Sequence, residues 1–325
     1  MKTVDVIIPT YKRAIFLARA IDSVLNQTYP YVNVIVVDDN TVGDRYRVET
    51  QQIMLNYHED NRVTYLKHEI NKNGAAARNT GLRFSKSSYV ALLDDDDFFC
   101  RDKIENQIKA IEGLDNSWGG VSCYHVRRYK QYAYTTYSIN ERADGNYCYD
   151  FLTGKTSTPS STLLLRKEIF DVIGYFDESF KRHQDLEFLV RFYRKFKMAI
   201  SPHYDTYMQI EGFRNYPVAE KAYQIKAKFL NKYRDDIAAF TKEQREEIYK
   251  FQWFDIACLY LRERKFKKAK EVFTKEVFKY KKATFKDILR VFFFILSGYV
   301  PVFKKLTAIL LSKIKYSRFS KKMSC

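Results

Sequence analysis

"YVALLDDDDFFCRDK" (residues 89–103) places four consecutive aspartates directly after a short apolar run. The apolar residues 89–93 are typical of a strand that is buried on both faces of a sheet. Four carboxylates at one strand end repel one another unless positive charge lies among them. In an open α/β sheet, ligands bind at the carboxyl ends of the strands, and carboxylate oxygens suit Mg²⁺ or Mn²⁺. The stretch therefore predicts a buried strand that ends at a metal and phosphate site, with a solvated acidic turn as the simpler alternative.

Apolar runs and helix-like segments alternate over the first third of the chain. The strand-like runs lie at 4–8, 32–37, 63–66 and 89–93. The segments with helical spacing or composition lie at 17–25, 44–59, 75–85 and 102–113. Strands that alternate with helices at this spacing predict an α/β fold, with a mostly parallel, Rossmann-like sheet flanked by helices.

The pattern changes after residue 118. Tyrosine-rich segments at 121–129 and 132–139 predict further strands, as does the run 161–165. An apolar stripe predicts a helix over 182–196. Beyond about residue 217 every segment has helical character, including a helical hairpin over 249–280. We therefore expect an all-helical region after the sheet.

The composition favours a folded protein with a large core. Of the 325 residues, 46% are hydrophobic and 16% are aromatic, which argues against general disorder. The five cysteines have neither the spacing of a metal site nor that of a disulfide framework: Cys100, Cys123, Cys148, Cys258 and Cys325. No signal peptide precedes the first strand-like run. These features predict a reducing, cytoplasmic location.

The positive charge is concentrated in the C-terminal quarter. Residues 241–325 hold 22 Lys/Arg and 8 Asp/Glu, and so contribute +14 of the net charge of +17. Within that region, 288–303 is apolar apart from Arg290, and no acid follows Asp287. An apolar run that is short for a membrane span and is flanked by cations predicts a helix on an anionic membrane surface. The alternative is packing on the protein body or on a second subunit, and nucleic acid is disfavoured because it requires no phenylalanine cluster.

Five motifs follow one another in a fixed order. They are "VDVIIPTYKR" (4–13), "VIVVDDNT" (34–41), "NKNGAAARNTGL" (71–82), "YVALLDDDDFF" (89–99) and "GYFDESFKRHQDLEFLVRF" (174–192). Together they resemble the family 2 glycosyltransferases over roughly residues 3–215. The resemblance implies a GT-A fold and an inverting, hexosyltransferase-type enzyme that uses nucleotide-sugars in surface-polysaccharide biosynthesis. With the charge pattern, it divides the chain into a catalytic domain (1–215), a helical extension (216–287) and a membrane-associating tail (288–325).

The resemblance also implies roles for particular residues. The loop after the first strand would cup the nucleotide base, the acids after the second strand would contact a uracil-type base, and the Arg-Asn-x-Gly segment would line the nucleotide site. The first aspartate of the tetrad would lie near the ribose. The residues implied in donor binding are Pro9, Thr10, Tyr11, Asp38, Asp39, Arg78, Asn79, Asp94 and Asp95. Asp96 would hold Mn²⁺ or Mg²⁺, and Asp185 would be the catalytic base.

The chemistry of glycosyl transfer agrees with these roles. Negative charge develops on the leaving diphosphate, and a divalent ion on Asp96 stabilises it without proton transfer. The acceptor hydroxyl loses a proton as it attacks, so a carboxylate is needed on the opposite face of the sugar. Asp185 is the candidate, and one base without a second nucleophile predicts single displacement with inversion. We expect a UDP-sugar donor, a glycan or lipid-linked saccharide acceptor, and a location at the inner face of the cell membrane.

Several simpler interpretations are weighed against these roles. Asp185 could cap its helix, and Asp38 with Asp39 could form a solvated turn. Glu187 and Arg191 are expected to form an ordinary i, i+4 ion pair. The chain also departs from the family pattern, since Gln184 stands in place of a glutamate, and Glu211 lies near the position of an expected histidine.

Two other functions compete with glycosyl transfer. A nucleotidyltransferase of related fold would favour a glycine-rich first loop, which "IPTYKR" lacks. A non-enzymatic protein that binds nucleic acid would explain the basic tail but not the acids at two strand ends. A processive polysaccharide synthase is disfavoured because the chain lacks several spanning helices and a Gln-x-x-Arg-Trp segment.

Overall fold

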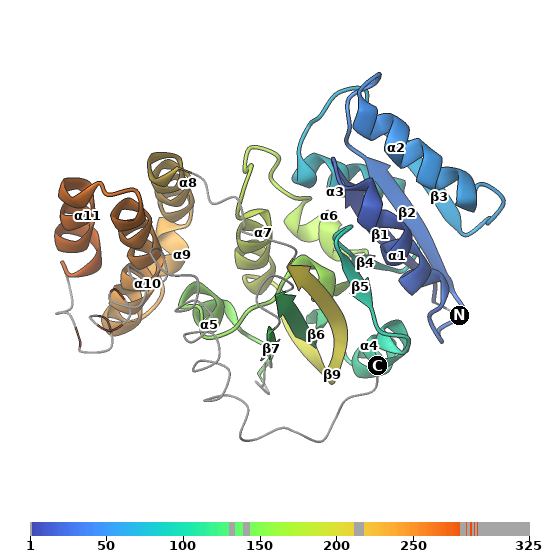
Figure 1. Ribbon diagram of the computed structural model, residues 1–325. Helices are drawn as coiled ribbons and strands as arrows, with labels where there is room; N and C mark the ends of the chain where they lie inside the picture. The colour runs from blue at the N-terminus through green and yellow to red at the C-terminus, as the bar shows by residue number, and fades with distance from the viewer. Residues whose placement is uncertain are drawn as a thin grey trace.

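The computed structural model describes residues 2–129, 134–138, 144–210 and 218–279, and beyond these only residues 284, 287, 289 and 291. Its strands are β1 (Val4–Thr10), β2 (Val32–Asp38), β3 (Val63–Lys67), β4 (Tyr89–Leu92), β5 (Asp97–Phe99), β6 (Trp118–Tyr129), β7 (Tyr134–Ser138), β8 (Leu164–Arg166) and β9 (Lys197–Ile210). They form one sheet in the order β3-β2-β1-β4-β8-β6-β9-β5, with β7 paired to β6 (Figure 1).

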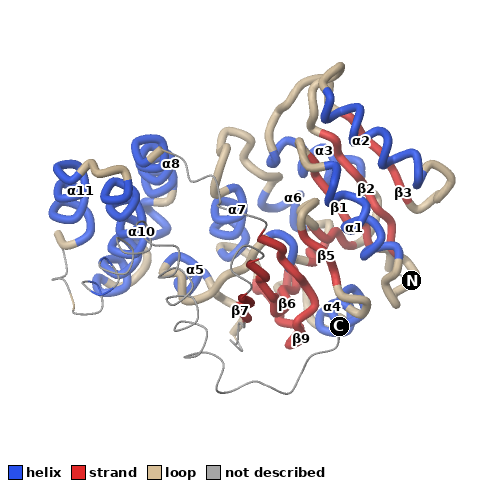
Figure 2. Tube along the Cα trace, in the orientation of Figure 1, coloured by secondary structure: helices blue, strands red, loops and turns tan. Residues whose placement is uncertain are grey.

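Helices flank this sheet and then continue alone. The helices are α1 (Ala14–Leu25), α2 (Arg45–Met54), α3 (Gly74–Phe84), α4 (Lys103–Ile111), α5 (Cys148–Leu152), α6 (Ile169–Ile173), α7 (Gln184–Tyr193), α8 (Ala219–Lys232), α9 (Arg234–Ala238), α10 (Lys242–Arg262) and α11 (Phe266–Val272). Figure 2 shows helices on both sides of the first strands, with α8, α10 and α11 beyond α7.

The first four strands in the sheet order pair in parallel, as the alternating pattern predicts. Beyond β4 the sheet is mixed, because β8 pairs antiparallel with both β4 and β6, whereas β6 and β9 pair in parallel. The predicted α/β class, with an all-helical region after it, is confirmed. The carboxyl ends of β1, β2 and β4 meet at one edge of the sheet, where the predicted acids lie.

The core lies on both faces of the sheet. Alternate side chains of β1 face opposite ways: Val4, Val6 and Ile8 belong to a cluster with α1 and α4, whereas Ile7 belongs to a second cluster with α3, α6 and α7. Helix α3 approaches β1 closely, because a Cβ atom at Gly81 would lie 2.6 Å from the Ile7 side chain. A glycine is therefore required where α3 crosses the strand that leads to the site.

Some predicted boundaries are wrong for local reasons. The helix expected over 182–196 occupies only Gln184–Tyr193, and the strand expected over 161–165 begins at Leu164 because Ser160–Thr162 form a 3₁₀ turn. The short strand β5 was not predicted. It forms because residues 97–99 pair antiparallel with Thr206, Tyr207 and Met208 of β9, a partner more than a hundred positions away.

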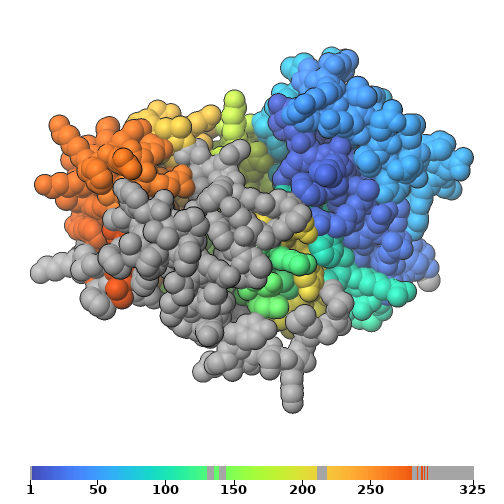
Figure 3. Space-filling model, viewed as in Figure 1, coloured from blue at the N-terminus to red at the C-terminus, as the bar shows by residue number. Residues whose placement is uncertain are grey.

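The helices after the sheet have their own core. Trp253, Ala257 and Tyr260 of α10 pack with Ala269 and Val272 of α11, which confirms the predicted hairpin, although it begins earlier, at Lys242. Figure 3 shows the residues of these helices (orange) and the N-terminal residues (blue) at opposite ends of the molecule. The predicted boundary at 215/216 and nearly all of the tail from 288 to 325 lie outside the described residues. Within the residues that are described, no helix is both long and apolar enough to cross a membrane.

Candidate active site

The aspartate tetrad forms a tight turn between β4 and β5. The backbone N–H of Asp97 donates to the carbonyl of Asp94 at 3.0 Å. The side chains of Asp95 and Asp97 point into the protein, and these two residues are 0% and 3% exposed to solvent. By contrast, 33% of the Asp94 side chain and 29% of the Asp96 side chain are exposed. One ligand oxygen from each of Asp94, Asp96 and Asp97 lies within 4.8 Å of the others. The turn therefore gathers three possible metal ligands, of which the sequence assigned only Asp96.

Arginines supply the positive charge that the four carboxylates require. Arg78 on α3 pairs with Asp94 at 2.5 Å. Arg13, at the start of α1, contacts Asp95 at 2.6 Å and Asp96 at 2.5 Å. Arg19 on α1 donates from Nη2 to the backbone carbonyl of Asp96 at 2.6 Å. The tetrad is therefore neither a solvated turn nor an isolated cluster of like charge.

Burial shifts the protonation of the tetrad. Desolvation raises the pKa of Asp95 to about 7, although the charge of Arg13 and a hydrogen bond from Thr10 oppose the shift. Burial, together with the charges of Asp94 and Asp96, also raises the pKa of Asp97 well above its ordinary value, against a 2.6 Å hydrogen bond from Ser161. These carboxyl groups are therefore protonated more easily than an exposed aspartate, because little solvent stabilises their charged forms.

The first loop supports the tetrad from β1. Pro9 lies within β1 opposite Val37, and the Thr10 hydroxyl donates to Asp95 Oδ2 at 2.8 Å. Tyr11 is 38% exposed, and the ammonium of Lys12 lies 4.9 Å from its ring centroid. Of the three residues predicted to cup a base, Tyr11 is the one with an open side chain.

Asp38 is part of a buried network. Its carboxylate accepts hydrogen bonds from the backbone and side chain of Asn40 at 2.9 and 2.8 Å and from Tyr65 at 2.5 Å. Arg47 Nε lies 3.2 Å from its Oδ2. Burial raises its pKa, and these partners oppose that shift. The contacts organise the loop after β2.

Both carboxylate oxygens of Asp39 also accept hydrogen bonds. Oδ1 accepts from the His68 ring and from the backbone of Lys72 at 2.7 and 2.8 Å. Oδ2 accepts from the Asn71 side chain and the Asn73 backbone at 2.7 and 2.9 Å. With 2% of the residue exposed, Asp39 anchors the segment 68–73 to the end of β2. The solvated turn that was the simpler alternative for Asp38 and Asp39 is therefore wrong.

The Arg-Asn-x-Gly segment has two different functions in the structure. Arg78 faces the site and also donates to Gln184 Oε1 at 3.0 Å. Asn79 is 1% exposed. It donates to the Phe176 carbonyl and accepts from the Phe176 N–H, at 2.8 and 2.9 Å, and it donates to Glu178 Oε1 at 2.8 Å. Asn79 therefore fastens α3 to the segment that leads into α7.

Asp185 and Asp94 line the same cavity. This cavity of about 560 Å³ is bounded by Arg78, Asp94, Arg127, Phe151, Ser157, Thr158, Pro159, Ser160, Lys181, Arg182, His183, Gln184, Asp185, Met208 and Phe251. Asp94 is the one residue of the tetrad among those that line it, beside Arg78, and the N-terminal end of α7 contributes Gln184 and Asp185. The structure thus brings together the predicted donor side and the predicted base, which are about ninety positions apart in the sequence.

Burial makes Asp185 a stronger base than an exposed aspartate. Burial raises its pKa, the Leu186 N–H and the charge of Arg78 lower it, and the charge of Asp94 raises it. Oδ1 accepts from the Leu186 N–H at 2.9 Å, so this carboxylate also satisfies a backbone donor at the start of α7. The predicted pair of Glu187 and Arg191 is confirmed at 2.8 Å. Glu187 is fully buried there and also contacts Lys232 and Tyr233.

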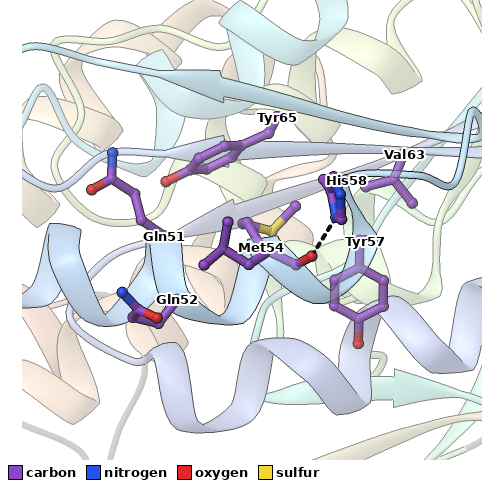
Figure 4. A pocket seen from close by; sticks show the side chains of 8 residues that line it. Gln51, Gln52, Met54, Tyr57, His58, Val63 and Tyr65 are labelled. Carbon is purple, nitrogen blue, oxygen red and sulfur yellow. Dashed lines mark hydrogen bonds between the residues drawn. The ribbon is translucent and has the colours of Figure 1, made fainter.

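A second cavity lies elsewhere. It has a volume of about 450 Å³ and is bounded by Gln51, Gln52, Met54, Leu55, Tyr57, His58, Val63 and Tyr65, between α2 and β3 (Figure 4). None of the predicted site residues lines it. The His58 ring interacts with the Leu55 carbonyl at 2.7 Å, and the described residues that line this cavity include no carboxylate.

Residues that the sequence interpretation missed are Arg13, Arg19 and Asp97. Arg13 belongs to the first motif and Asp97 to the aspartate tetrad, but the family resemblance implies no role for either of them. The signal for Arg13 was a single cation four residues after Pro9, which alone is indistinguishable from a surface arginine.

A mixed α/β sheet with an acidic turn at a strand end, facing a carboxylate across one cavity, defines a glycosyltransferase with the GT-A fold. The chain belongs to the glycosyl transferase family 2, whose family model matches residues 5–174. Members of this fold class typically use a divalent metal, and the acidic turn is present here. The match to this family favours glycosyl transfer over the two competing functions, a nucleotidyltransferase and a nucleic-acid-binding protein.

Relatives of the chain are bacterial. It is 32% identical over 197 residues to the uncharacterized glycosyltransferase RP339 of Rickettsia prowazekii, covering 59% of this chain and 58% of the relative. It is 33% identical over 128 residues to the UDP-Glc:alpha-D-GlcNAc-diphosphoundecaprenol beta-1,3-glucosyltransferase WfaP of Escherichia coli, covering 39% of this chain and 48% of WfaP. These matches span less than two thirds of either relative.

A solved structure supports the fold. The crystal structure of S. aureus TarS 1–349 in complex with UDP-GlcNAc matches with a TM-score of 0.51 and 18% identity, covering 80% of this chain and 82% of that one. At this identity the similarity establishes the fold alone.

Proposed function

We propose that this glycosyltransferase moves a sugar from a UDP-linked donor to a glycan or lipid-linked saccharide in surface-polysaccharide biosynthesis, by single displacement with inversion. The observation that carries the proposal is that Asp94 and Asp185 line one cavity. WfaP is named for a UDP-glucose donor and a diphosphoundecaprenol-linked acceptor. The amylovoran biosynthesis glycosyltransferase AmsB of Erwinia amylovora, 26% identical over 208 residues, is named for polysaccharide biosynthesis.

We place the donor on the side of the cavity lined by Asp94 and Arg78, next to the rest of the tetrad. The oxygens of Asp94, Asp96 and Asp97 are the hard ligands that Mg²⁺ or Mn²⁺ accepts, so the residues present fit such an ion. When bound, the ion would neutralise charge on the leaving diphosphate. Arg78 adds a cation on the same wall, and Tyr11 offers an exposed ring for a base. The donor contacts of Pro9, Thr10, Asp38, Asp39, Asn79 and Asp95 stay predictions. Apart from Pro9, these side chains have the internal partners described above.

The acceptor side is the wall formed by α7. As the acceptor oxygen bonds to the anomeric carbon, the bond from that carbon to the diphosphate breaks, and the hydroxyl proton passes to Asp185. The raised pKa of Asp185, caused by burial, makes it a better proton acceptor than an exposed aspartate. Lys181 and Arg182 also line the cavity, and their charge suits an acceptor that carries phosphate.

The division into catalytic domain, helical extension and tail is part of the proposal. An anionic membrane surface, bound through residues 288–325, would bring the chain to the inner face of the membrane where lipid-linked acceptors lie. The basis for this part is the sequence alone, in which cations flank an apolar run.

The test of the proposed function is a screen of nucleotide-sugars. Release of UDP would be measured for each UDP-sugar, with Mn²⁺ and with excess chelator, and a GDP-sugar and a CMP-sugar would serve as controls. We expect one UDP-sugar to be cleaved in the presence of metal. Cleavage of the GDP-sugar or CMP-sugar alone would contradict the UDP assignment, and equal cleavage in chelator would contradict the metal.

A further inference from the structure

One guanidinium bridges the two central aspartates of the tetrad. Arg13 lies between β1 and α1, with Nη2 at 2.6 Å from Asp95 Oδ1 and Nη1 at 2.5 Å from Asp96 Oδ2. Two donors on a planar fork hold two carboxylates in a defined relative orientation. A lysine ammonium carries the same charge but lacks this geometry.

The two aspartates that Arg13 contacts differ in their exposure to solvent. The Asp95 side chain is fully buried and also accepts from Thr10, whereas 29% of the Asp96 side chain is exposed. Because a buried charge without its partner is strongly destabilising, the contact with Asp95 keeps Arg13 in place. Arg13 in turn restrains the more exposed Asp96.

Asp96 has one oxygen bonded to Arg13, and it belongs to the group of three acids whose ligand oxygens lie within 4.8 Å. We propose that Arg13 is a positioning residue for the divalent cation: anchored on Asp95, it holds the Asp96 carboxylate so that a ligand oxygen of Asp96 stays close to those of Asp94 and Asp97. This inference rests on the metal dependence in the proposed function. Arg13 acts through Asp96 and contacts neither the sugar nor the reacting atoms.

The charge of Arg13 and its orientation of Asp96 have opposite effects on metal affinity, so the direction in which the affinity changes tests the proposal. A positive charge near the ion repels it, so removing Arg13 would tighten metal binding if charge alone mattered. If orientation matters more, removing Arg13 weakens metal binding. Arg83 on α3 is the control for the loss of one positive charge, because its side chain is 56% exposed and its ion pair, at 3.7 Å, is with Glu178 and not with the tetrad.

The experiment is a titration with Mn²⁺, in which free Mn²⁺ is followed by electron paramagnetic resonance with and without UDP. The full chain is compared with Arg13→Gln, Arg13→Lys and Arg83→Gln, and thermal unfolding checks each fold. We expect both Arg13 variants to bind Mn²⁺ about 10–100-fold more weakly, the range for residues that orient a metal ligand. Arg83→Gln should bind Mn²⁺ as the wild type does.

Three outcomes would overturn the inference. Unchanged or tighter binding by Arg13→Gln would show that charge outweighs orientation. Wild-type affinity in Arg13→Lys would show that the bridge is dispensable, and this variant also supplies the measurement if Arg13→Gln does not fold. A wild type that binds no Mn²⁺ even with UDP would remove both the inference and the metal dependence of the proposed function. Normal wild-type binding with unaffected Arg13 variants would remove only the inference.

Discussion

Arg78 and Asp94 form an ion pair with 2.5 Å between Nη2 and Oδ1. The same guanidinium donates to Gln184, the first residue of α7. Arg78 therefore connects the acidic turn with the helix that carries Asp185. A glutamate at position 184, as the family pattern has, would add a second negative charge beside Arg78, whereas the neutral Gln184 leaves more of its positive charge for a ligand.

Arg78→Gln is expected to lower kcat/KM. Hydrogen bonds to charged groups contribute about 1.5–3 kcal/mol, which corresponds to a loss of about 10–100-fold in rate. Steady-state kinetics with the identified donor would measure it. Arg83→Gln is the control on the same helix, because Arg83 is 56% exposed and its pair with Glu178 is long, at 3.7 Å. Equal losses in both variants would assign the effect to α3 and not to the site.

Asp96→Asn and Asp97→Asn should both reduce metal-stimulated turnover, because their oxygens belong to the same group of three. The Asp97 variant distinguishes two predictions. The family motif places the metal on Asp96 alone, whereas the structure adds Asp97 to the possible ligands. The dependence of rate on Mn²⁺ concentration checks both variants. Full activity of Asp97→Asn at low Mn²⁺ would restrict the site to Asp94 and Asp96, and full wild-type activity in chelator would contradict the metal role.

Asp185→Asn keeps the size of the side chain and removes its basicity. We expect kcat to fall about 10²–10⁴-fold, as for a positioned general base, while donor binding measured by calorimetry is largely kept. Asp171→Asn, in the exposed part of α6, is the control and should be normal. Proton NMR of the product should show an inverted anomeric centre, and retention would contradict single displacement.

The same residue predicts a pH dependence with a definite sign. Asp185 accepts a proton only when it is ionised, and burial raises its pKa. The rate of the wild type should therefore fall as the pH drops through a value above the ordinary range of aspartate. The pKa values of the tetrad acids are also raised, so the comparison is made at saturating Mn²⁺, where Asp185→Asn should lose the part of the acidic limb that Asp185 causes.

Glu187→Gln should destabilise the fold. Glu187 is fully buried between Arg191, Lys232 and Tyr233, and removal of one partner from a buried ion pair costs about 3–5 kcal/mol. We expect the low end of that range, because 35% of the Lys232 side chain reaches solvent. Urea unfolding followed by circular dichroism would measure the change.

The pH dependence of this loss is a further check. Burial alone would raise the pKa of Glu187, but hydrogen bonds from Arg191, Lys232 and Tyr233 bring it below its ordinary value. A lowered pKa stabilises the fold above the unfolded value and loses that effect as the pH falls through the folded value. The difference between wild type and Glu187→Gln should therefore shrink in acid. A constant difference would assign the loss to packing.

The tail is expected to bind anionic membranes. In vesicle flotation, the full chain should float with anionic vesicles but not with neutral ones, and a chain that ends at Lys286 should stay unbound. High salt should weaken the binding, because Lys and Arg near the surface act through screened charge. A full chain that stays in solution with anionic vesicles at low salt would show that the apolar run packs on protein instead.

The strand ends were predictable because buried parallel strands leave long apolar runs. Val32–Asp38 and the acids after Leu93 could be placed from local sequence alone. The partners of those acids could not, because they come from distant segments: Arg13 reaches Asp95 from the end of β1, and His68 reaches Asp39 from the end of β3. Asn79 shows the same limit, since its motif indicates a ligand contact, whereas its amide is bonded to Phe176.

The four hydrogen bonds that Asp39 accepts have a consequence for base recognition. A nucleobase could bond to this carboxylate only by replacing a donor that already satisfies it, so the number of hydrogen bonds would not increase. Such an exchange adds little to affinity, because a bond of similar strength is lost. It does penalise a base whose edge presents an acceptor, which would leave the buried carboxylate unsatisfied. A base contact at Asp39 would therefore contribute more to discrimination between nucleotides than to the affinity for any one of them.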